Sequence, residues 1–238
     1  MAKGIENMSF GQNLQALRKL HNGMTQEALA EKMNVSRQTV SKWESDDCYP
    51  EMDKALELSK LFHCTLDHLF RESIGVCGKA CSDIRVEETA PFRYFEYTVV
   101  SREPEDDALS HVKRTAQRLG IAEPEVIGWD FPCLSQDQIN VHHMHGYTAA
   151  CILPDDWQGD AKGVAVLAHQ RQKYCAITVK DPFRAPFFLI PGAYQTLMDY
   201  MRVNGIAHRA EKGVIPCFEK CRVKDGVDYM DICIAAAL

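Results

Sequence analysis

The sequence lacks the features that would place a protein in a membrane or outside the cell. Its apolar runs stay well short of the roughly 20 residues that a membrane-spanning helix needs. No apolar segment follows a basic start, so we expect no signal peptide, no membrane partner and a cytoplasmic location. In that compartment the 10 cysteines are expected to be reduced thiols rather than a disulfide framework.

The chain also lacks a basic excess and a zinc-binding pattern of cysteines. Its 27 basic and 33 acidic side chains give a net charge of −6, which argues against a broad basic surface that grips nucleic acid without specificity. The cysteine spacing does not form the CxxC…CxxC pattern of a zinc site. We also expect no cofactor. Contact with DNA would have to come from a local patch, and the candidate side chains are Lys19, Lys32, Arg37 and Lys42.

Residues 25–44 predict two short helices joined by a tight turn. Thr25 is a candidate N-cap for the first helix, Asn34 lies in the turn, and Ser36 is a candidate N-cap for the second helix. At about 100° per residue, the second helix has one polar half and one half that can pack against the protein. The polar half carries Arg37, Gln38, Ser41 and Lys42.

A polar helix face that follows an N-cap and a preceding helix fits the DNA major groove. These residues resemble the XRE family of lambda-repressor-like helix-turn-helix proteins, through LRKL, TQEALA, VSRQTVSKWE and a Pro-headed fourth helix. The resemblance covers about the first third of the chain and implies an all-α DNA-binding domain of five helices at residues 1–70. It also implies that Arg18 and Glu44 form an internal salt bridge. The implied partner is double-stranded operator DNA, bound as a homodimer because one helix reads only a short half-site.

The resemblance implies roles for individual side chains. Gln26 is expected to bond the phosphate backbone, and Gln38 is expected to read a base, since glutamine pairs with adenine through two hydrogen bonds. Arg37 and Lys42 are expected to contact phosphates, which position a protein without specifying sequence. The full predicted DNA-binding set is Gln26, Ser36, Arg37, Gln38, Ser41 and Lys42.

Residues 71–90 lack clean periodicity and predict a linker between two domains. Cys77 and Cys81 lie inside this segment. A redox pair and half of a metal site are both open interpretations, but the cytoplasmic context favours two solvent-accessible thiols.

From residue 91 the pattern changes to aromatic and β-branched strands separated by helices. The order strand–helix–strand–strand occurs twice, which predicts an α+β domain with an internal duplication and a seam that is a candidate ligand pocket. The expected strands are 92–100, 126–131, 146–153, 163–169, 174–179, 215–221 and 229–235, and the expected helices start at Glu103 and Pro191.

Residues 91–238 resemble the GyrI-like small-molecule-binding domain, which is also the effector domain of AraC-type and multidrug-sensing regulators. The resemblance is carried, in this order, by IGWDFP, HGYTAA, KYCAITVKDPF, IPGAY, CFEKC and DGVDYMDI. In that family an acidic residue on a late strand lies at the bottom of an aromatic-lined cleft, and Glu219 matches it. A carboxylate there would attract a cationic or hydrogen-bond-donating ligand. The candidate walls, which could instead be ordinary core, are Trp129, Phe131, Tyr147 and Tyr174.

Two other clusters invite a metal interpretation, and we adopt neither. His143 and His145 would share one face of a strand while His142 would not, so three ligands from one strand would need an unusual bend. Cys217, Glu219 and Cys221 would share a face and could hold a soft metal, which is a minority interpretation.

The leading hypothesis is a one-component transcriptional regulator that binds operator DNA through its N-terminal helix-turn-helix and senses a small cationic or aromatic molecule in its C-terminal domain. The alternative is a GyrI-like hydrolase of reactive small molecules, with Glu219 as the base and Tyr147 as a nearby phenol. A third interpretation, a protein-binding adaptor, has no specific support. The attached DNA-binding domain favours sensing, so we expect no enzyme activity and no catalytic residue.

Overall fold

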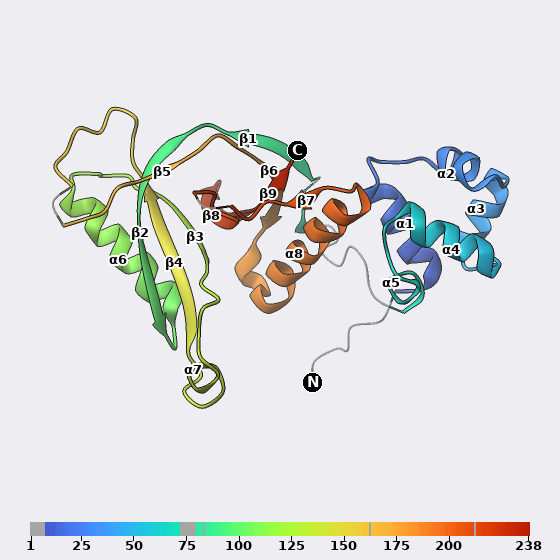
Figure 1. Cartoon of the computed structure of the whole chain (residues 1–238), viewed down its shortest axis with the longest axis horizontal. Helices are drawn as coiled ribbons and strands as arrows, with labels where there is room; N and C mark the ends of the chain where they lie inside the picture. The colour runs from blue at the N-terminus through green and yellow to red at the C-terminus, as the bar shows by residue number, and fades with distance from the viewer. Residues whose placement is uncertain (1–7, 72–79, 83, 162, 212) are drawn as a thin grey trace. The chain divides into compact units, whose positions relative to one another are not determined.

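The computed structural model describes residues 8–71, 80–82, 84–161, 163–211 and 213–238. The chain divides into two compact units, each built from separate stretches of sequence (Figure 1). None of the described helices is both long and apolar enough to span a bilayer. The first unit contains the described parts of Met1–Ile84 with Pro182–His208 and Ala237–Leu238, and the second unit contains Arg85–Asp181 and Arg209–Ala236.

The first unit begins with the five helices that the sequence predicts. Polar N-caps explain where they start, because the side-chain oxygens of Ser9, Thr25 and Ser36 each accept a hydrogen bond from a backbone N–H three residues on. Asn34 follows α2 in the left-handed conformation, with a φ of 51°, which asparagine tolerates better than most residues. The helices are α1 (Phe10–Leu20), α2 (Gln26–Met33), α3 (Arg37–Glu44), α4 (Met52–Leu61) and α5 (Leu66–Phe70).

These helices enclose one apolar core. Leu14 and Leu17 share a face of α1 and have no exposed surface. Val40 and Trp43 from α3 are buried against them. The packing half of α3 is therefore the half that the sequence assigned to it, and the polar half is left outside.

A long helix from later in the chain belongs to the first unit. The sequence placed the start of this helix at Pro191, but Pro186 occupies the first turn and Pro191 lies inside the helix. A proline in the first turn loses no helical hydrogen bond, which explains why the helix begins there. Val203, its last residue, is fully buried in the core formed by α1–α5. The elements of this stretch are η2 (Pro182–Arg184), α8 (Pro186–Val203) and β7 (Ala207–His208).

The second unit is built on an antiparallel sheet. Its strands follow one another across the sheet in the order β1-β6-β9-β8-β3-β4-β2-β5. Along the chain, strand–helix–strand–strand occurs as β2-α6-β3-β4 and again as β6-α8-β8-β9, with the two-residue β7 between α8 and β8, so the predicted α+β class is confirmed. The elements are β1 (Arg85–Thr89), β2 (Phe92–Ser101), α6 (Pro104–Arg118), β3 (Glu125–Asp130), α7 (Gln136–Asn140), β4 (His145–Ile152), β5 (Leu167–His169), β6 (Gln172–Lys180), β8 (Cys217–Lys224) and β9 (Val227–Ala237).

The predicted linker contains a strand that its sequence did not indicate. Residues 85–89 form β1, which pairs with β6 along its whole length. Cys77 lies outside the described residues. Cys81 is disulfide-bonded, so the expectation of a reduced thiol is wrong at this position. The spacing of cysteines in the sequence does not show which sulfur atoms lie close together in the fold. The cysteines described as free thiols are Cys48, Cys64, Cys133, Cys151, Cys175, Cys217, Cys221 and Cys233.

The two faces of the sheet carry different apolar clusters, because side chains alternate along each strand. On one face α6 lies along β2 and β4 (Figure 1). Phe95, Tyr147 and Ala149 point toward this helix and are buried with it. On the opposite face, Tyr94 and Tyr174 belong to a separate buried cluster.

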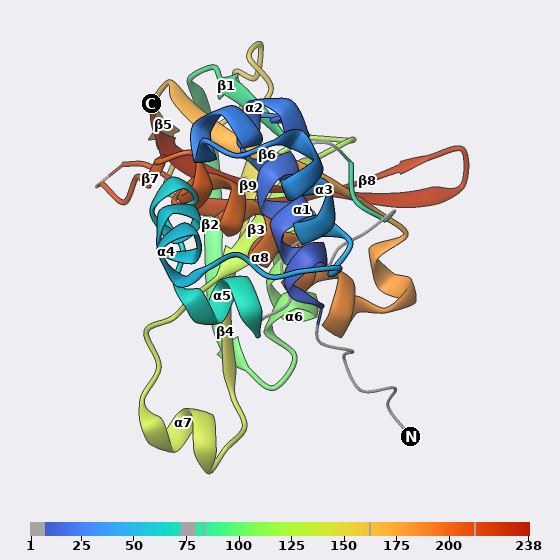
Figure 2. The same ribbon diagram turned by 90° about the vertical axis from the view of Figure 1, so that its right-hand side faces the viewer.

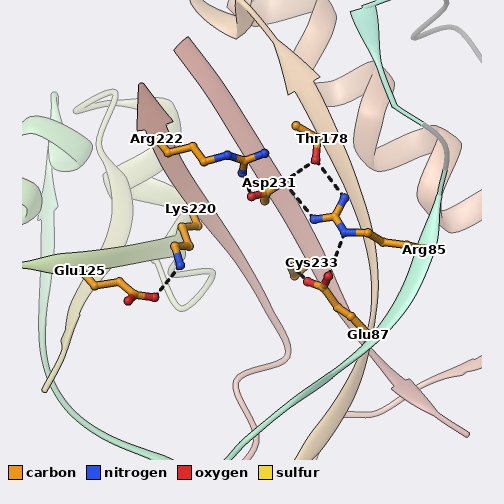
Figure 3. Close-up of polar contacts among 8 residues, drawn as sticks. All are labelled: Arg85, Glu87, Glu125, Thr178, Lys220, Arg222, Asp231 and Cys233. Atoms are coloured by element: carbon orange, nitrogen blue, oxygen red, sulfur yellow. Dashed lines mark hydrogen bonds and ion pairs between the residues drawn. The ribbon is translucent and has the colours of Figure 1, made fainter. Parts of the chain in front are cut away.

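A polar network ties four strands of the sheet together at the buried Asp231 of β9 (Figure 3). Arg85 of β1 donates to this carboxylate at 3.0 Å, and Arg222 of β8 forms a second ion pair with it. Thr178 of β6 also donates to Asp231 and accepts from Arg85 at 2.9 Å. The network satisfies a buried charge with several donors, as buried charges require, and we assign it a structural role.

Strands β8 and β9 form a hairpin with a two-residue turn (Figure 2). Asp225 and Gly226 both have positive φ, of 53° and 74°. This Asp-Gly pair fits the type I′ turn, whose twist matches that of the flanking strands. The turn fixes the register that brings Glu219 opposite Ile232.

Candidate nucleic-acid interface and ligand site

Helix α3 presents an exposed polar half on a packed base. Val40 is completely buried and Trp43 is 3% exposed, so the orientation of the helix is fixed by the core. The Ser36 oxygen accepts from the Thr39 N–H at 3.1 Å and so caps the helix. The exposed side chains are the ones predicted from the sequence, namely Ser36, Arg37, Gln38, Ser41 and Lys42.

Behind this helix, three side chains form a hydrogen-bonded chain. Arg18 donates to both oxygens of Glu44, at 2.6 and 2.9 Å, which is the bidentate geometry that a guanidinium favours. Gln26, at the start of α2, donates from Nε2 to Glu44 at 2.9 Å. The internal salt bridge expected for Arg18 and Glu44 is therefore present.

The pKa of Glu44 reflects these contacts. Burial raises it, but the hydrogen bonds from Arg18 and Gln26 and the Arg18 charge outweigh burial, so the pKa lies below its usual value. Glu44 therefore stays ionised and holds the Gln26 amide in place. The second N–H of that amide is left for an acceptor such as a phosphate oxygen.

Arg37 has a different partner on the surface. Its Nε lies 2.7 Å from a carboxylate oxygen of Glu27, and both side chains are 64% exposed. Exposed ion pairs of this kind are weak and are screened by salt. A phosphate group could therefore replace Glu27 as the partner of Arg37 at little cost.

The second candidate site lies on the α6-facing side of the sheet. The Tyr147 hydroxyl on β4 donates to the Glu219 carboxylate on β8 across an O–O distance of 3.5 Å, which is long. Gly128 of β3 lies between them, paired with both strands in register. A Cβ at Gly128 would lie 2.2 Å from the Tyr147 hydroxyl oxygen, so only glycine leaves room for the phenol at this position. Gly128 was not predicted from the sequence, because the residues IGW do not by themselves indicate that a side chain packs against this glycine.

Acidic groups surround the Tyr147 phenol. Burial raises its pKa first, and nearby negative groups, of which Glu219, Glu105 and Asp130 are carboxylates, raise it further. Desolvation by neighbouring side chains also raises the pKa of Asp130 and Glu105, although much of each residue remains exposed. Glu105 and Asp130 were not predicted, because their approach depends on where α6 packs on the sheet. The phenol stays protonated, and the local field favours a cation.

The two cysteines beside Glu219 add no charge to this site. Cys217 and Cys221 alternate with their neighbours so that they share its face of β8. Desolvation by neighbouring groups, with a smaller effect of nearby carboxylates, raises the pKa of each thiol to about 11, although Cys221 is an exposed residue. Both are neutral at pH 7 and are poor nucleophiles. Across the described ranges, no group of three or more His, Cys, Asp or Glu side chains is arranged to hold a metal ion.

The structure does not bring all the predicted wall residues together. Trp129 neighbours Gly128 on β3 and points to the opposite face, and Tyr174 is buried in the cluster on that face. The Tyr174 hydroxyl donates to the carbonyl of Ile215 at 2.9 Å, so it is engaged in the core. Phe131 follows the end of β3 and is half-buried there, where its backbone N–H donates to Gly146. Among the four aromatics, Tyr147 forms a hydrogen bond with Glu219.

Comparisons with known proteins identify the first part of the chain. A family model described as a helix-turn-helix matches residues 14–69, so this segment is a helix-turn-helix domain of the XRE type. The HTH-type transcriptional activator BcrR of Enterococcus faecalis is 48% identical over 62 residues, which are 26% of this chain. The match spans 30% of the length of that relative.

Solved structures resemble either part of the chain. The crystal structure of the P22 c2 repressor in complex with a synthetic operator is 32% identical, with a TM-score of 0.25, over 26% of this chain and 94% of that one. The crystal structure of the EcmrR C-terminal domain is 7% identical, with a TM-score of 0.46, over 65% of this chain and 96% of that one.

Proposed function

We propose that this chain, which carries a helix-turn-helix domain at residues 14–69, is a one-component transcriptional regulator that binds operator DNA as a homodimer and senses a small cationic molecule. The observation that carries the proposal is the exposed polar half of α3, held on a buried base within that domain. Gln38 reads a base edge, and Arg37, Ser41 and Lys42 lie beside it on the same half.

Phosphate contacts position the domain on DNA. Gln26 is oriented by Glu44 at the first turn of α2, where the helix dipole favours an anion. Arg37 and Lys42 add positive charge near the base-reading side chain. Because the chain has a net charge of −6, these local groups provide the attraction for DNA, and binding weakens steeply with salt.

The effector site is the cluster around Tyr147 and Glu219. Three carboxylates act on the Tyr147 phenol, and the thiols beside Glu219 are neutral, so the charged groups that raise the pKa of the phenol are acidic. An aromatic cation suits it, because the phenol ring contributes a face and the carboxylates contribute charge. Binding changes operator affinity only if the ligand prefers one of two states of the protein.

The DNA-binding part is tested by fluorescence anisotropy on an operator that the wild-type protein selects from a random duplex library. We expect Gln38→Ala and Arg37→Ala each to weaken binding at least about fivefold, since one good base contact contributes about 1–3 kcal/mol. Gln117→Ala, an exposed glutamine of α6, is the matched control and should bind as the wild type does. Wild-type affinity in both α3 variants would contradict base reading by this helix.

The sensing part is tested by calorimetry with tetraphenylphosphonium, a permanent cation with aromatic surface. We expect Glu219→Gln to weaken its binding about fivefold or more, because the substitution removes the charge and keeps the shape. Glu123→Gln, an exposed glutamate before β3, is the control for a general effect of charge. Equal affinity in wild type and Glu219→Gln would remove Glu219 from the site.

Hydrolysis remains the second candidate, and the contact between Tyr147 and Glu219 is the observation that favours it. A carboxylate beside a phenol could activate water against a reactive small molecule. The test is multiple turnover of an activated ester by the full chain. Turnover that Glu219→Gln abolishes would support an enzyme, and binding without turnover supports a sensor.

A further inference from the structure

Helix α8 is connected at both ends to the second unit, but it belongs to the first unit. The chain enters this segment from β6 at Asp181 and returns to the second unit at Arg209, so both of its ends continue into the sheet. The helix itself is part of the first unit, together with the DNA-binding helices. A helix that is covalently tied to one unit at both ends and packed in the other is suited to transmit a change between them.

The C-terminal turn of α8 is built into the end of α1. Val203 is completely buried in the core of the DNA-binding helices. Its carbonyl accepts a hydrogen bond from Nδ1 of His21, the residue that follows α1, at 3.0 Å. In return, Asn204 donates from Nδ2 to the carbonyl of Leu20, the last residue of α1, at 2.9 Å.

The same turn also reaches the end of α4. Arg202 donates from Nη1 to the carbonyls of Phe62 and His63, at 3.4 and 3.1 Å. Its other terminal nitrogen donates to Asp199 at 2.6 Å, and that aspartate is 2% exposed, which fixes the guanidinium in place.

These contacts meet a requirement of every helix end. The last carbonyls of α1 and α4 have no partner within their own helices, and they carry the negative end of the helix dipole. Asn204 adds a second donor to the Leu20 carbonyl, which also accepts from the Asn22 N–H, and Arg202 supplies donors to the carbonyls of the two residues that follow α4. Arg202 also adds a positive charge where the dipole favours it. The turn therefore acts as a shared C-cap for two DNA-binding helices, although it lies about 140 to 180 residues further along the chain.

From α1 the contacts continue to the DNA-binding surface. Arg18, in the last turn of α1, donates to Glu44, and Glu44 accepts from Gln26. The backbones of α1 and α3 also touch, since a Cβ at Gly11 would lie 2.6 Å from the Glu44 carbonyl oxygen. A displacement at the capped end of α1 would therefore reach both the recognition helix and Gln26.

We propose that α8 is the coupling element of this regulator: its terminal turn, Arg202–Asn204, holds the ends of α1 and α4, and a shift of α8 on ligand binding changes operator affinity. The coupling rests on the proposed function, because it needs an operator and a ligand. The capping of α1 and α4 needs neither an operator nor a ligand, and it is tested separately.

The first experiment measures capping by hydrogen exchange on the full-length protein, without ligand or DNA. We expect Arg202→Ala and Asn204→Ala to speed exchange at the amides of residues 21–24 and 62–64 about tenfold. Arg184→Ala, an exposed arginine of η2 in the same unit, should leave these amides unchanged, and Arg202→Lys should restore part of the protection. Unchanged exchange in both Arg202→Ala and Asn204→Ala would overturn the proposal.

The second experiment measures coupling as the ratio of operator Kd values with and without saturating tetraphenylphosphonium. We expect a ratio of about 5 or more in wild type and Arg184→Ala, in the usual range for coupled sites, and below about 2 in Arg202→Ala. Calorimetry should show the same tetraphenylphosphonium affinity in all three. A full ratio in Arg202→Ala would overturn the coupling. If wild type does not bind this cation, the ligand class of the proposed function is wrong, and the exchange experiment alone decides whether α8 caps the DNA-binding helices.

Discussion

Replacing Glu44 with alanine would remove the acceptor that Arg18 and Gln26 share. The Glu44 side chain is 3% exposed and that of Arg18 is 10% exposed, so the substitution leaves a buried guanidinium without its anion. Loss of one partner from a buried ion pair costs about 3–5 kcal/mol. We expect the lower end, about 3 kcal/mol, because Arg18 keeps its hydrogen bond of 2.6 Å to the Met24 carbonyl.

The loss of stability should depend on pH. The pKa of Glu44 lies below its usual 4.5, because the contacts with Arg18 and Gln26 outweigh burial. A carboxyl group whose pKa is lowered by folding contributes its full stabilisation above the unfolded pKa and loses it as pH falls through the folded pKa. The difference in unfolding free energy between wild type and Glu44→Ala is therefore full at pH 7 and narrows below about pH 4.5.

Urea denaturation followed by Trp43 fluorescence measures this difference, in a background where Trp129 and Trp157 are replaced by phenylalanine. Trp43 is buried beside Glu44 in α3, so its emission reports the first unit. Glu57→Ala removes an exposed glutamate paired with Lys54 at 2.9 Å and should change stability by less than about 1 kcal/mol. A loss below about 1 kcal/mol for Glu44→Ala, or one that is the same at pH 4 and pH 7, would refute the reasoning.

Three further predictions concern the second unit. Gly128→Ala places a methyl group against the Tyr147 ring, so we expect a loss of about 1–3 kcal/mol in urea denaturation and weaker tetraphenylphosphonium binding; wild-type values for both would be contrary. Asp231→Asn weakens a carboxylate shared by two half-exposed arginines, and we expect a loss of about 1–3 kcal/mol in the same assay, whereas no loss would show that the network is dispensable. Burial lowers the pKa of His169, whose Nε2 lies 2.8 Å from the Tyr174 oxygen, so the unfolded state takes up its proton first and stability should fall as pH drops below 6.5. His169→Phe should make the stability depend less on pH between pH 6.5 and 5. An unchanged dependence would show that other groups cause it.

The helix-turn-helix could be predicted in detail because its signals are local. The caps Thr25 and Ser36, the turn at Asn34 and the separation of buried from polar positions in α3 all lie within 20 residues, and the structure has each of them. By contrast, β1 at residues 85–89 reads RVEET, which resembles a charged linker. It is a strand because it pairs with β6, and that partner lies some 90 residues away.

The ligand site was predictable only in part, because strand register decides which side chains share a face of the sheet with Glu219. The sequence shows that Glu219 alternates with its neighbours, but not which residues of β3 and β4 lie beside it. The pairing of Gly128 with Glu219 assigns Tyr147 to the same face and turns Trp129 to the other. The role of α8 was also hidden, since nothing in the residues 202–204 indicates that they cap two helices from the start of the chain.

The central claim, that α3 reads bases, is tested most directly by a double-mutant cycle between Gln38 and one A·T pair of the selected operator. Wild-type protein should lose about 5- to 150-fold in affinity when that pair is changed to G·C, as one bidentate contact predicts. Gln38→Ala should bind both operators with nearly equal affinity. Undiminished discrimination by Gln38→Ala at every A·T pair of the half-site would contradict the claim.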